Sequence, residues 1–460
     1  MAFIGVAPAT TAAKGKEKTV AAPHPPLGAK VPFRVPQRAE ELTTEWLTDV
    51  LRYRQLVPAN ISVTSVSHMP IGDGVMGDIS AISLEYSGSC DAPTSLIAKF
   101  SPVGKAPLPS FVIRAVFKTE SLFYWDLSVQ DGGLIRPECY LALYDKARSR
   151  PSFCLLLEDL RPARLFSRVG PPGTVASLDD HASLHAFVAG LARLHARWWE
   201  HPKARPLDWV LHPSKDFGGL VLRGFMRTAK LGLPALVKCY PDTYAPLRSW
   251  LPHLRRRHRF IVQECLKPPL TLTHGDAHIE NAFFDARFVA ASAAAAVRGE
   301  AKHGAAPSGA AFIDFGNMMF SPCTSDVAFF LVHSLDVGVR RALEGDLLRH
   351  YYATLVANGV DATTYPYERC WHDYKFNLWR ALLSVCAMAP GLLSQKKRRT
   401  GMFSADPKAM SEAERKEKAL YEQLNERCVA ALLDHKWLEL LLEESGAPSC
   451  GLCSCISVCY

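Results

Sequence analysis

The chain has 460 residues, 48% of them apolar and 21% charged, so it is long enough to form two lobes or domains around a sizeable core. Its formal net charge of +8 is modest and its dense basic runs are limited to residues 255–259 and 396–399, a pattern that argues against nucleic acid as a partner. The 13 cysteines lack a disulfide-scaffold spacing, which favours a reducing, cytoplasmic compartment, and no run of about 18 apolar residues predicts a transmembrane segment.

The first part of the chain has the pattern of an antiparallel sheet. Residues 1–35 contain one acidic residue among Ala, Pro, Thr and Lys, which predicts a disordered N-terminal arm because little apolar surface is available for burial. A helix is expected over 39–53, with Thr43 or Thr44 as its N-cap. After it, turn-rich stretches separate runs with strand character. In chain order we expect strands at 61–69, 79–86 and 95–100, a helix at 111–129, and strands at 141–144 and 153–157.

The pattern turns helical after residues 158–162, which interrupt the apolar run and are the candidate hinge between two lobes. Ser177 and Asp180 have the spacing of a capping box before the first of these helices. The fold class is therefore α+β, with a small antiparallel β-sheet lobe at 36–160 and a mainly α-helical lobe at 161–446. Further helical patterns cover about 222–238, 244–265, 326–343, 367–388 and 412–444.

Two segments depart from this organisation. Residues 286–310 are rich in Ala, Gly, Ser and Lys and predict a flexible surface insertion. Residues 447–460 are rich in cysteine but lack the paired Cys-x-x-Cys motifs of a zinc site. We interpret them as a disordered tail, while metal binding and reversible lipidation, with a weak membrane association, are the alternatives.

Polar residues gather in two motifs on either side of the insertion. The first has the sequence HGDAHIEN (274–281) and the second the sequence DFG (314–316). Phosphoryl transfer requires a carboxylate that orients the acceptor hydroxyl, together with oxygen ligands for magnesium. Asp276 fits the first role, whereas Asn281 and Asp314 fit the second. The interval from Asp276 to Asn281 is also that of a kinase catalytic loop.

The first motif matches the pattern His-Gly-Asp-x-His-x-x-Asn in full, and the chain thereby resembles the aminoglycoside phosphotransferase and choline kinase superfamily. Within it, the chain looks most like the ecdysteroid-kinase-like (CHK kinase-like) group, through the stretches LARLHARWW (191–199), LLEDL (156–160) and TESLFY (119–124). The resemblance covers about residues 40–442. It implies a two-lobed protein-kinase-like fold, with a nucleotide-binding N-lobe, an acceptor-binding C-lobe, and ATP and Mg²⁺ as cofactors.

The resemblance also assigns residues to the nucleotide. Lys99 would contact the α- and β-phosphates from a strand, and Glu120 would hold that lysine from a helix. A glycine-rich turn between two expected strands could cover the phosphates, because a glycine backbone can approach them closely. The glycines of this turn are Gly72, Gly74 and Gly77.

Several residues near the motifs have more than one interpretation. His278 either faces a phosphate or has a structural role, whereas His274 is expected to hold the loop by hydrogen bonds. Alternating His and Asp could also bind a transition metal along a strand, but Gly275 and Asn281 break the strand and the DFG motif then stays unexplained. Asp326 resembles the aspartate that braces this loop in the superfamily, or is a first-turn charge of a helix. His195 is interpreted as a core histidine.

These features predict a small-molecule kinase that moves the γ-phosphate of ATP to a hydroxyl of a choline-, sterol- or aminoglycoside-like alcohol. A protein kinase is the first alternative, although residues 321–326 enter a helix almost at once and leave little room for a peptide-docking segment. A catalytically inactive scaffold is the second, although the expected catalytic residues are all present. An aromatic helical stripe either lines an acceptor pocket or packs in the core, and it comprises Trp371, Tyr374, Leu378 and Trp379.

Overall fold

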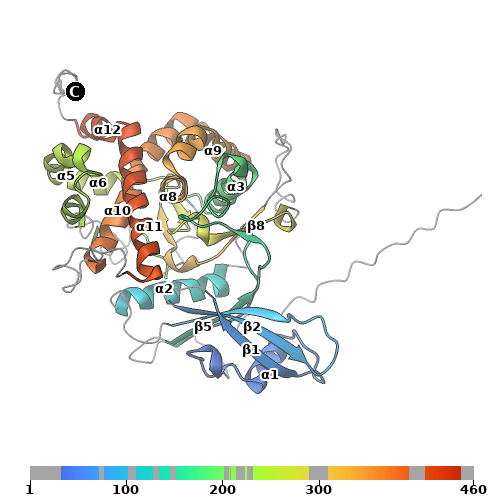
Figure 1. The fold of residues 1–460 in the computed structure, drawn as a ribbon. Coiled ribbons are helices and arrows are strands. Elements are labelled where there is room, and N and C mark those ends of the chain that lie inside the picture. Colours follow the sequence, from blue (N-terminus) through green and yellow to red (C-terminus); the bar gives the residue numbers. More distant parts are fainter. Residues whose placement is uncertain are drawn as a thin grey trace, which may run out of the picture.

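The chain forms two lobes, an N-lobe built on a β-sheet and a larger helical C-lobe (Figure 1). Several sequence predictions lie outside the described residues, namely most of the arm 1–35, Gly72 and Gly74, most of the insertion 286–310, and the tail 447–460. The computed structural model describes residues 33–71, 77–101, 110–127, 134–145, 152–200, 207, 209–213, 223–224, 232–289, 309–392 and 410–446.

The N-lobe sheet has five antiparallel strands in the spatial order β1-β2-β3-β5-β4. Each expected strand is present close to its predicted bounds, so the prediction of this sheet is confirmed. The elements of this lobe are η1 (Ala39–Glu41), α1 (Thr44–Tyr53), β1 (Val63–Pro70), β2 (Asp78–Tyr86), β3 (Ser95–Phe100), α2 (Ser110–Leu122), the π-helical segment η2 (Phe123–Leu127), β4 (Cys139–Asp145) and β5 (Ser152–Glu158).

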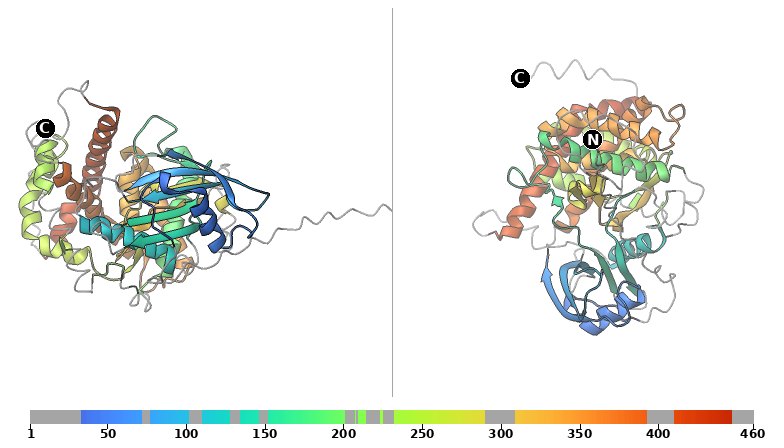
Figure 2. Two further views of the ribbon diagram at one scale, coloured as in Figure 1. Left: turned by 90° about the horizontal axis from the view of Figure 1, so that it is seen from below. Right: turned by 90° about the vertical axis from the view of Figure 1, so that its right-hand side faces the viewer.

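Helices α1 and α2 cover opposite faces of this sheet. Helix α1 begins where the sequence predicts it, because the Thr43 hydroxyl oxygen accepts a hydrogen bond from the N–H of Trp46 at 3.2 Å. Successive side chains of a strand point to opposite faces. Leu156 of β5 therefore packs in the apolar core with α1, whereas Leu155 packs in the core with Phe117 of α2. Helix α2 lies between the sheet and the C-lobe (Figures 1 and 2), and its buried residues belong to one apolar core with this face of the sheet and with the C-lobe.

The C-lobe is mainly α-helical, as expected, and contains two small sheets with the strand orders β10-β7 and β6-β8-β9. The predicted capping box of Ser177 and Asp180 is present at its first helical turn. The described elements of this lobe are β6 (Arg164–Leu165), η3 (Leu178–Asp180), α3 (His181–Arg197), η5 (Ala245–Trp250), α5 (Leu251–Arg256), α6 (His258–Glu264), β7 (Thr271–Thr273), η6 (Ile279–Asn281), β8 (Ala282–Asp285), β9 (Gly309–Phe312), η7 (Phe315–Asn317), β10 (Met319–Ser321), α8 (Thr324–Ser334), α9 (Val337–Ala357), α10 (Tyr367–Leu392), α11 (Glu412–Asp434) and α12 (Trp437–Glu444).

Three of the expected helical patterns are divided. The pattern at 326–343 belongs to α8 and α9, which an extended backbone at Leu335 separates (φ −107°, ψ 141°). The pattern at 412–444 belongs to α11 and α12, which a left-handed residue, Lys436, separates (φ 46°, ψ 46°). The pattern at 244–265 likewise covers η5, α5 and α6. Leu335 is fully buried, so the apolar spacing continues through that break and does not reveal it.

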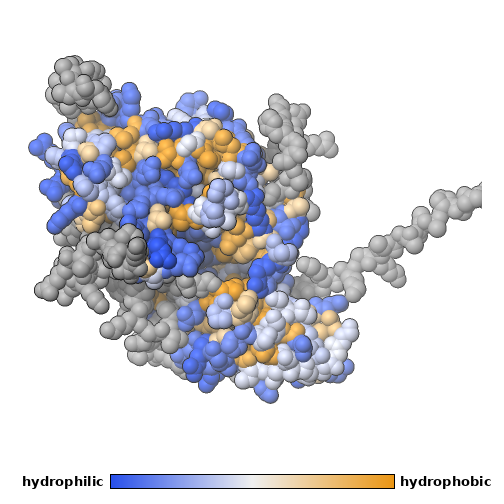
Figure 3. All heavy atoms as spheres, viewed as in Figure 1, coloured by the Kyte–Doolittle hydropathy of each residue, from blue (hydrophilic) through white to orange (hydrophobic). Residues whose placement is uncertain are grey.

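The surface in Figure 3 mixes hydrophilic and hydrophobic residues over both lobes. In the described part of the chain, no helix combines the length and the apolar character needed to span a membrane. The cytoplasmic location stays a prediction.

Candidate active site

The two sequence motifs lie on neighbouring loops of the C-lobe. The loop of HGDAHIEN begins at His274, directly after β7, and the DFG motif begins at Asp314, two residues after β9. Strand β10 follows the second loop and pairs with β7, which brings the loops together. Gly275 has φ +80°, and a Cβ atom there would lie 2.0 Å from the backbone oxygen of Asn317. Only glycine fits between the loops at this position.

Asp326 of α8 braces the first loop from within the protein. Its carboxylate accepts hydrogen bonds from the backbone N–H groups of His274 at 2.6 Å and Gly275 at 3.0 Å. It also lies 3.1 Å from Nε2 of His195, a buried histidine whose Nδ1 lies 2.8 Å from the Tyr351 hydroxyl. Burial alone would raise the pKa of Asp326, but the hydrogen bond and charge of His195 and the loop N–H groups lower it. Both interpretations of Asp326 hold, because it is also a first-turn residue of α8.

The His274 side chain has the expected structural contact. Its Nε2 lies 2.9 Å from the backbone oxygen of Ile313, just before Asp314. This hydrogen bond ties the first loop to the second.

Lys99 of β3 lies between two carboxylates from different parts of the chain. Its Nζ is 2.9 Å from Glu120 of α2 and 3.0 Å from Asp314. Burial disfavours the charged form of Lys99, but the two carboxylates outweigh this effect and raise its pKa. Burial also disfavours the charged form of Asp314, but the Lys99 ammonium outweighs it and lowers the pKa of that aspartate. Burial dominates at Glu120 and raises its pKa to about 7. The structure thus joins the lysine and glutamate that the resemblance pairs.

The second loop packs directly against α2 and its π-helical continuation. Phe315 stacks on Phe123, with ring centroids 3.8 Å apart. A Cβ atom at Gly316 would lie 2.5 Å from Cγ1 of Val116, so the glycine allows this close approach. The contact holds the helix of Glu120 against the loop of Asp314, which explains why both carboxylates reach Lys99.

Asp276 projects from the first loop and remains partly accessible, with its side chain 28% exposed. One oxygen accepts a hydrogen bond from Nδ2 of Asn317 at 3.2 Å. Burial and the negative charge of Asp314 raise the pKa of Asp276 to about 6, although His274, Arg168 and Asn317 oppose this increase. Asp276 therefore combines a raised basicity with access from outside.

Asn281 and His278 complete the first loop. The Nδ2 atom of Asn281 donates to the backbone oxygen of Asp276 at 2.8 Å, so its amide oxygen is the atom available to a metal ion. His278 lies with Nε2 3.3 Å from that same amide nitrogen. Burial and the charge of Arg168 keep the pKa of His278 well below its usual value. His278 thus has a structural contact, and contact with a phosphate stays a prediction.

Two residues near this site were not singled out from the sequence. Asn317 directly follows the DFG motif, and this position was the available signal. Arg168 lies in a loop without periodic pattern, and its Nε contacts Glu280 at 2.7 Å. Only the folded chain brings it to the loop of Asp276.

Gly77 is the one glycine of the candidate phosphate-covering turn that the structure describes. It is buried at the start of β2, and a Cβ atom there would lie 2.5 Å from the backbone oxygen of Phe100. Phe100 directly follows Lys99 on β3. The turn therefore ends beside the strand that carries the lysine, while its role in binding phosphate stays a prediction.

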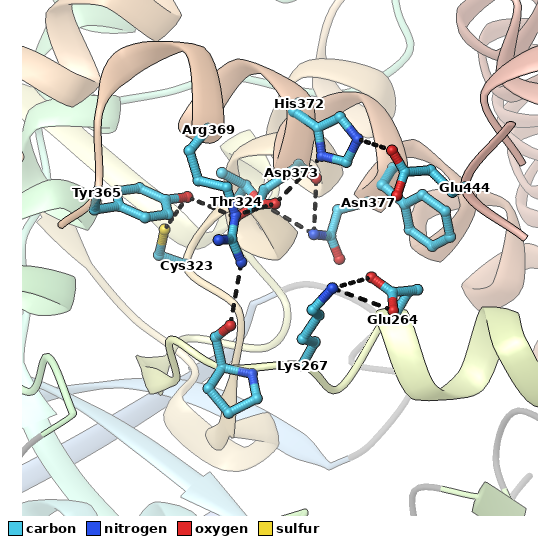
Figure 4. Close-up of polar contacts among 12 residues, drawn as sticks. Glu264, Lys267, Cys323, Thr324, Tyr365, Arg369, His372, Asp373, Asn377 and Glu444 are labelled. Carbon is cyan, nitrogen blue, oxygen red and sulfur yellow. Dashed lines mark hydrogen bonds and ion pairs between the residues drawn. The ribbon is translucent and has the colours of Figure 1, made fainter.

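Helix α10 separates an aromatic face from a charged one. The aromatic stripe packs in the core, as Tyr374, Leu378 and Trp379 are buried and Trp371 is partly buried. On the other face, polar residues line a small hollow whose side chains are joined by ion pairs and hydrogen bonds (Figure 4). The hollow adjoins Lys267, before β7, whereas Asp276 follows β7 at its other end. Of the two interpretations of the aromatic stripe, the structure therefore shows packing in the core.

Comparison with known protein families matches residues 71–362, more than half of the chain, to the ecdysteroid kinase-like family. A comparison with curated proteins gives no match.

The chain is also similar to several solved structures. An ethanolamine kinase from Plasmodium vivax has 12% sequence identity and a TM-score of 0.46 over 81% of this chain and 83% of its own. A choline kinase from Cryptosporidium parvum Iowa II has 9% identity and a TM-score of 0.43 over 88% of this chain and 97% of its own.

A macrolide 2'-phosphotransferase from Brachybacterium faecium has 12% identity and a TM-score of 0.38 over 75% of this chain and 97% of its own. The family match extends from the strand before the lysine-bearing β3 to the end of α9 and includes the HGDAHIEN and DFG motifs. This protein therefore belongs to the ecdysteroid kinase-like family.

Proposed function

We propose that this protein is an ATP- and magnesium-dependent phosphotransferase that moves the γ-phosphate to a hydroxyl of a small molecule. One observation carries the proposal. Lys99, Asp314 and Asp276 converge from β3 and from the loops after β9 and β7, with Lys99 and Asp314 3.0 Å apart and Asp314 close enough to raise the pKa of Asp276. Membership of the ecdysteroid kinase-like family supports the same reaction class.

The donor atoms of this centre fit magnesium. Asp314 offers a carboxylate and Asn281 an amide oxygen, and hard oxygen ligands of this kind are those that magnesium prefers. The lowered pKa of Asp314 keeps its carboxylate ionised at neutral pH. Magnesium, when bound, supplies positive charge that bridges and neutralises phosphate oxygens.

Lys99 would contribute a fixed positive charge to the phosphates. The carboxylate of Glu120 holds the ammonium at 2.9 Å from the side of α2. Because Glu120 already holds the lysine side chain in place, little free energy is spent on reorienting the ammonium when a phosphate binds. Glu120 is therefore a positioning residue that acts through Lys99.

Asp276 would orient the acceptor hydroxyl and accept its proton. Its pKa of about 6 leaves it ionised at neutral pH and yet more basic than an ordinary aspartate. Asn317 donates to one oxygen at 3.2 Å and so fixes the orientation of the carboxylate.

The short connection after the DFG motif supports a small acceptor rather than a protein. All residues from Gly316 to Thr324 are described, and they form the end of η7, strand β10 and the start of α8. Strand β10 is paired with β7 over its whole length. This stretch lacks an extended segment of the kind that docks a peptide beside the reacting phosphate.

Magnesium-dependent turnover of ATP tests the proposal. The protein is assayed with pooled alcohols, amino alcohols, sterols and aminoglycosides, beside a generic protein substrate and the Asp276→Ala variant. We expect transfer to one class of small alcohol, and its loss in the variant. Transfer to protein alone would contradict the proposed acceptor. Nucleotide binding without transfer to any acceptor would instead favour an inactive scaffold.

A further inference from the structure

Two histidines and one aspartate meet between α3 and α9, at a place that the proposed reaction does not use. His181 and His185 lie one helical turn apart at the start of α3, and Asp346 lies on α9. The two helices pack side by side (Figure 1). One potential ligand atom from each residue lies within 4.8 Å of the other two. The described part of the chain contains no other such group of His, Cys, Asp or Glu.

The hydrogen bonds of His185 prepare its ring for a cation. Its Nδ1 lies 2.8 Å from the backbone oxygen of His181, an acceptor, so Nδ1 carries the proton of the neutral ring. The lone pair of Nε2 then faces the carboxylate of Asp346 at 2.9 Å. Two acceptors this close need a cation between them, which is either a proton on Nε2 or a metal ion. A metal-bound histidine commonly donates its other N–H to a backbone carbonyl, as His185 does here.

The closest pair of these atoms has nearly the spacing that a small tetrahedral ion requires, and the third atom lies within 4.8 Å of both. Zinc–nitrogen and zinc–oxygen bonds of about 2.0–2.1 Å place neighbouring tetrahedral ligands about 3.3 Å apart. The His185–Asp346 pair at 2.9 Å would need to open by only a few tenths of an ångström. Imidazole nitrogens favour zinc, cobalt, nickel or copper over magnesium. The His185 and Asp346 side chains are 24% and 52% exposed, so an ion can enter from solvent.

We propose that His181, His185 and Asp346 form a binding site for a divalent transition-metal ion of the zinc class, with water in the fourth position. The ion joins α3 to α9. The same helices carry His195 and Tyr351. His195 lies about 15 Å further along α3 than His185, contacts Asp326, and is itself contacted by the Tyr351 hydroxyl. The site is thus a clamp on the helix pair that braces the loop of Asp276. This proposal does not depend on phosphotransferase activity.

Zinc titration by calorimetry at pH 7.5, with millimolar magnesium to saturate the carboxylate centre, measures the site in the full-length protein. The wild type is compared with His185→Ala and Asp346→Asn. His372→Ala is the matched control, because His372 also contacts carboxylates, those of Asp373 and Glu444, but belongs to no group of three potential metal ligands among the described residues. Circular dichroism without zinc shows whether each variant is folded.

We expect one zinc equivalent in the wild type and in His372→Ala, and a loss of at least about 100-fold in affinity in the other two variants. X-ray absorption on the zinc-bound wild type should show nitrogen or oxygen neighbours at about 2.0–2.1 Å, whereas cysteines of residues 447–460 would give sulfur at about 2.3 Å. Unchanged zinc affinity in His185→Ala, or a sulfur shell, would overturn the proposal. So would the absence of binding in the wild type, which would leave only a His185–Asp346 ion pair.

Discussion

Asp276 projects from the loop that Asp326 braces from within the protein, yet their surroundings give the two aspartates opposite properties. Asp326 is buried, accepts two backbone N–H groups and faces His195, and its pKa is lowered. Asp276 accepts one side-chain hydrogen bond, lies near the carboxylate of Asp314, and has a raised pKa. The donors and the charges around a carboxylate thus decide whether it anchors the fold or remains basic enough to accept a proton.

The largest expected effect separates the two aspartates by activity. In Asp276→Ala the acceptor hydroxyl loses its proton acceptor, so we expect turnover to fall by about 10²–10⁴-fold. Steady-state kinetics with the alcohol identified in the panel measures the change. The control is Asp179→Ala, which replaces an exposed aspartate of η3 and should retain full turnover. A decrease below about tenfold in Asp276→Ala would remove Asp276 from the catalytic role.

The second effect separates them by stability. Asp326→Ala leaves the N–H groups of His274 and Gly275 and the buried His195 ring without their acceptor. We expect the free energy of unfolding to fall by about 3–5 kcal/mol, measured by urea denaturation. Asp179→Ala should leave it unchanged. A fully stable Asp326→Ala protein would mean that the loop does not depend on this brace.

The third prediction concerns pH. Because Asp276 must be ionised to accept a proton and its pKa is about 6, kcat/KM should be constant above about pH 7 and fall at lower pH. At pH 5 it should be about tenfold below its plateau. A profile with an apparent pKa near 4 would show that Asp276 titrates as an ordinary aspartate.

The smallest effect is a gain in stability. The folded-state pKa of Asp276, about 6, lies above its ordinary value of 3.8, so the stability of the folded state falls as pH rises from about 3.8 to about 6 and is constant above that. Asp276→Asn removes that charge and should stabilise the protein by about 1–2 kcal/mol at pH 7.5. The gain should shrink toward pH 4, where the wild-type carboxyl is protonated. Thermal unfolding of both proteins at the two pH values checks the sign; equal gains at both would exclude the charge as its cause.

The sequence by itself determined the sheet of the N-lobe, the helical character of the C-lobe, and the residues of the two motifs. Alternating apolar residues and turn signals act locally, and a motif such as HGDAHIEN keeps its spacing whatever surrounds it. Helix breaks were not visible in the same way. At Leu335 the apolar spacing continues because the residue between the two helices is itself buried.

Only the tertiary structure decided which distant residues meet. The distance from Lys99 to Asp314, the donation of Asn317 to Asp276, and the approach of Arg168 to Glu280 each join segments far apart in the chain. So does the meeting of His185 with Asp346, since a histidine pair on one helix does not show which side chain of another helix will face it. The pKa values of these groups follow from the same contacts, because burial and neighbouring charges exist only once the chain has folded.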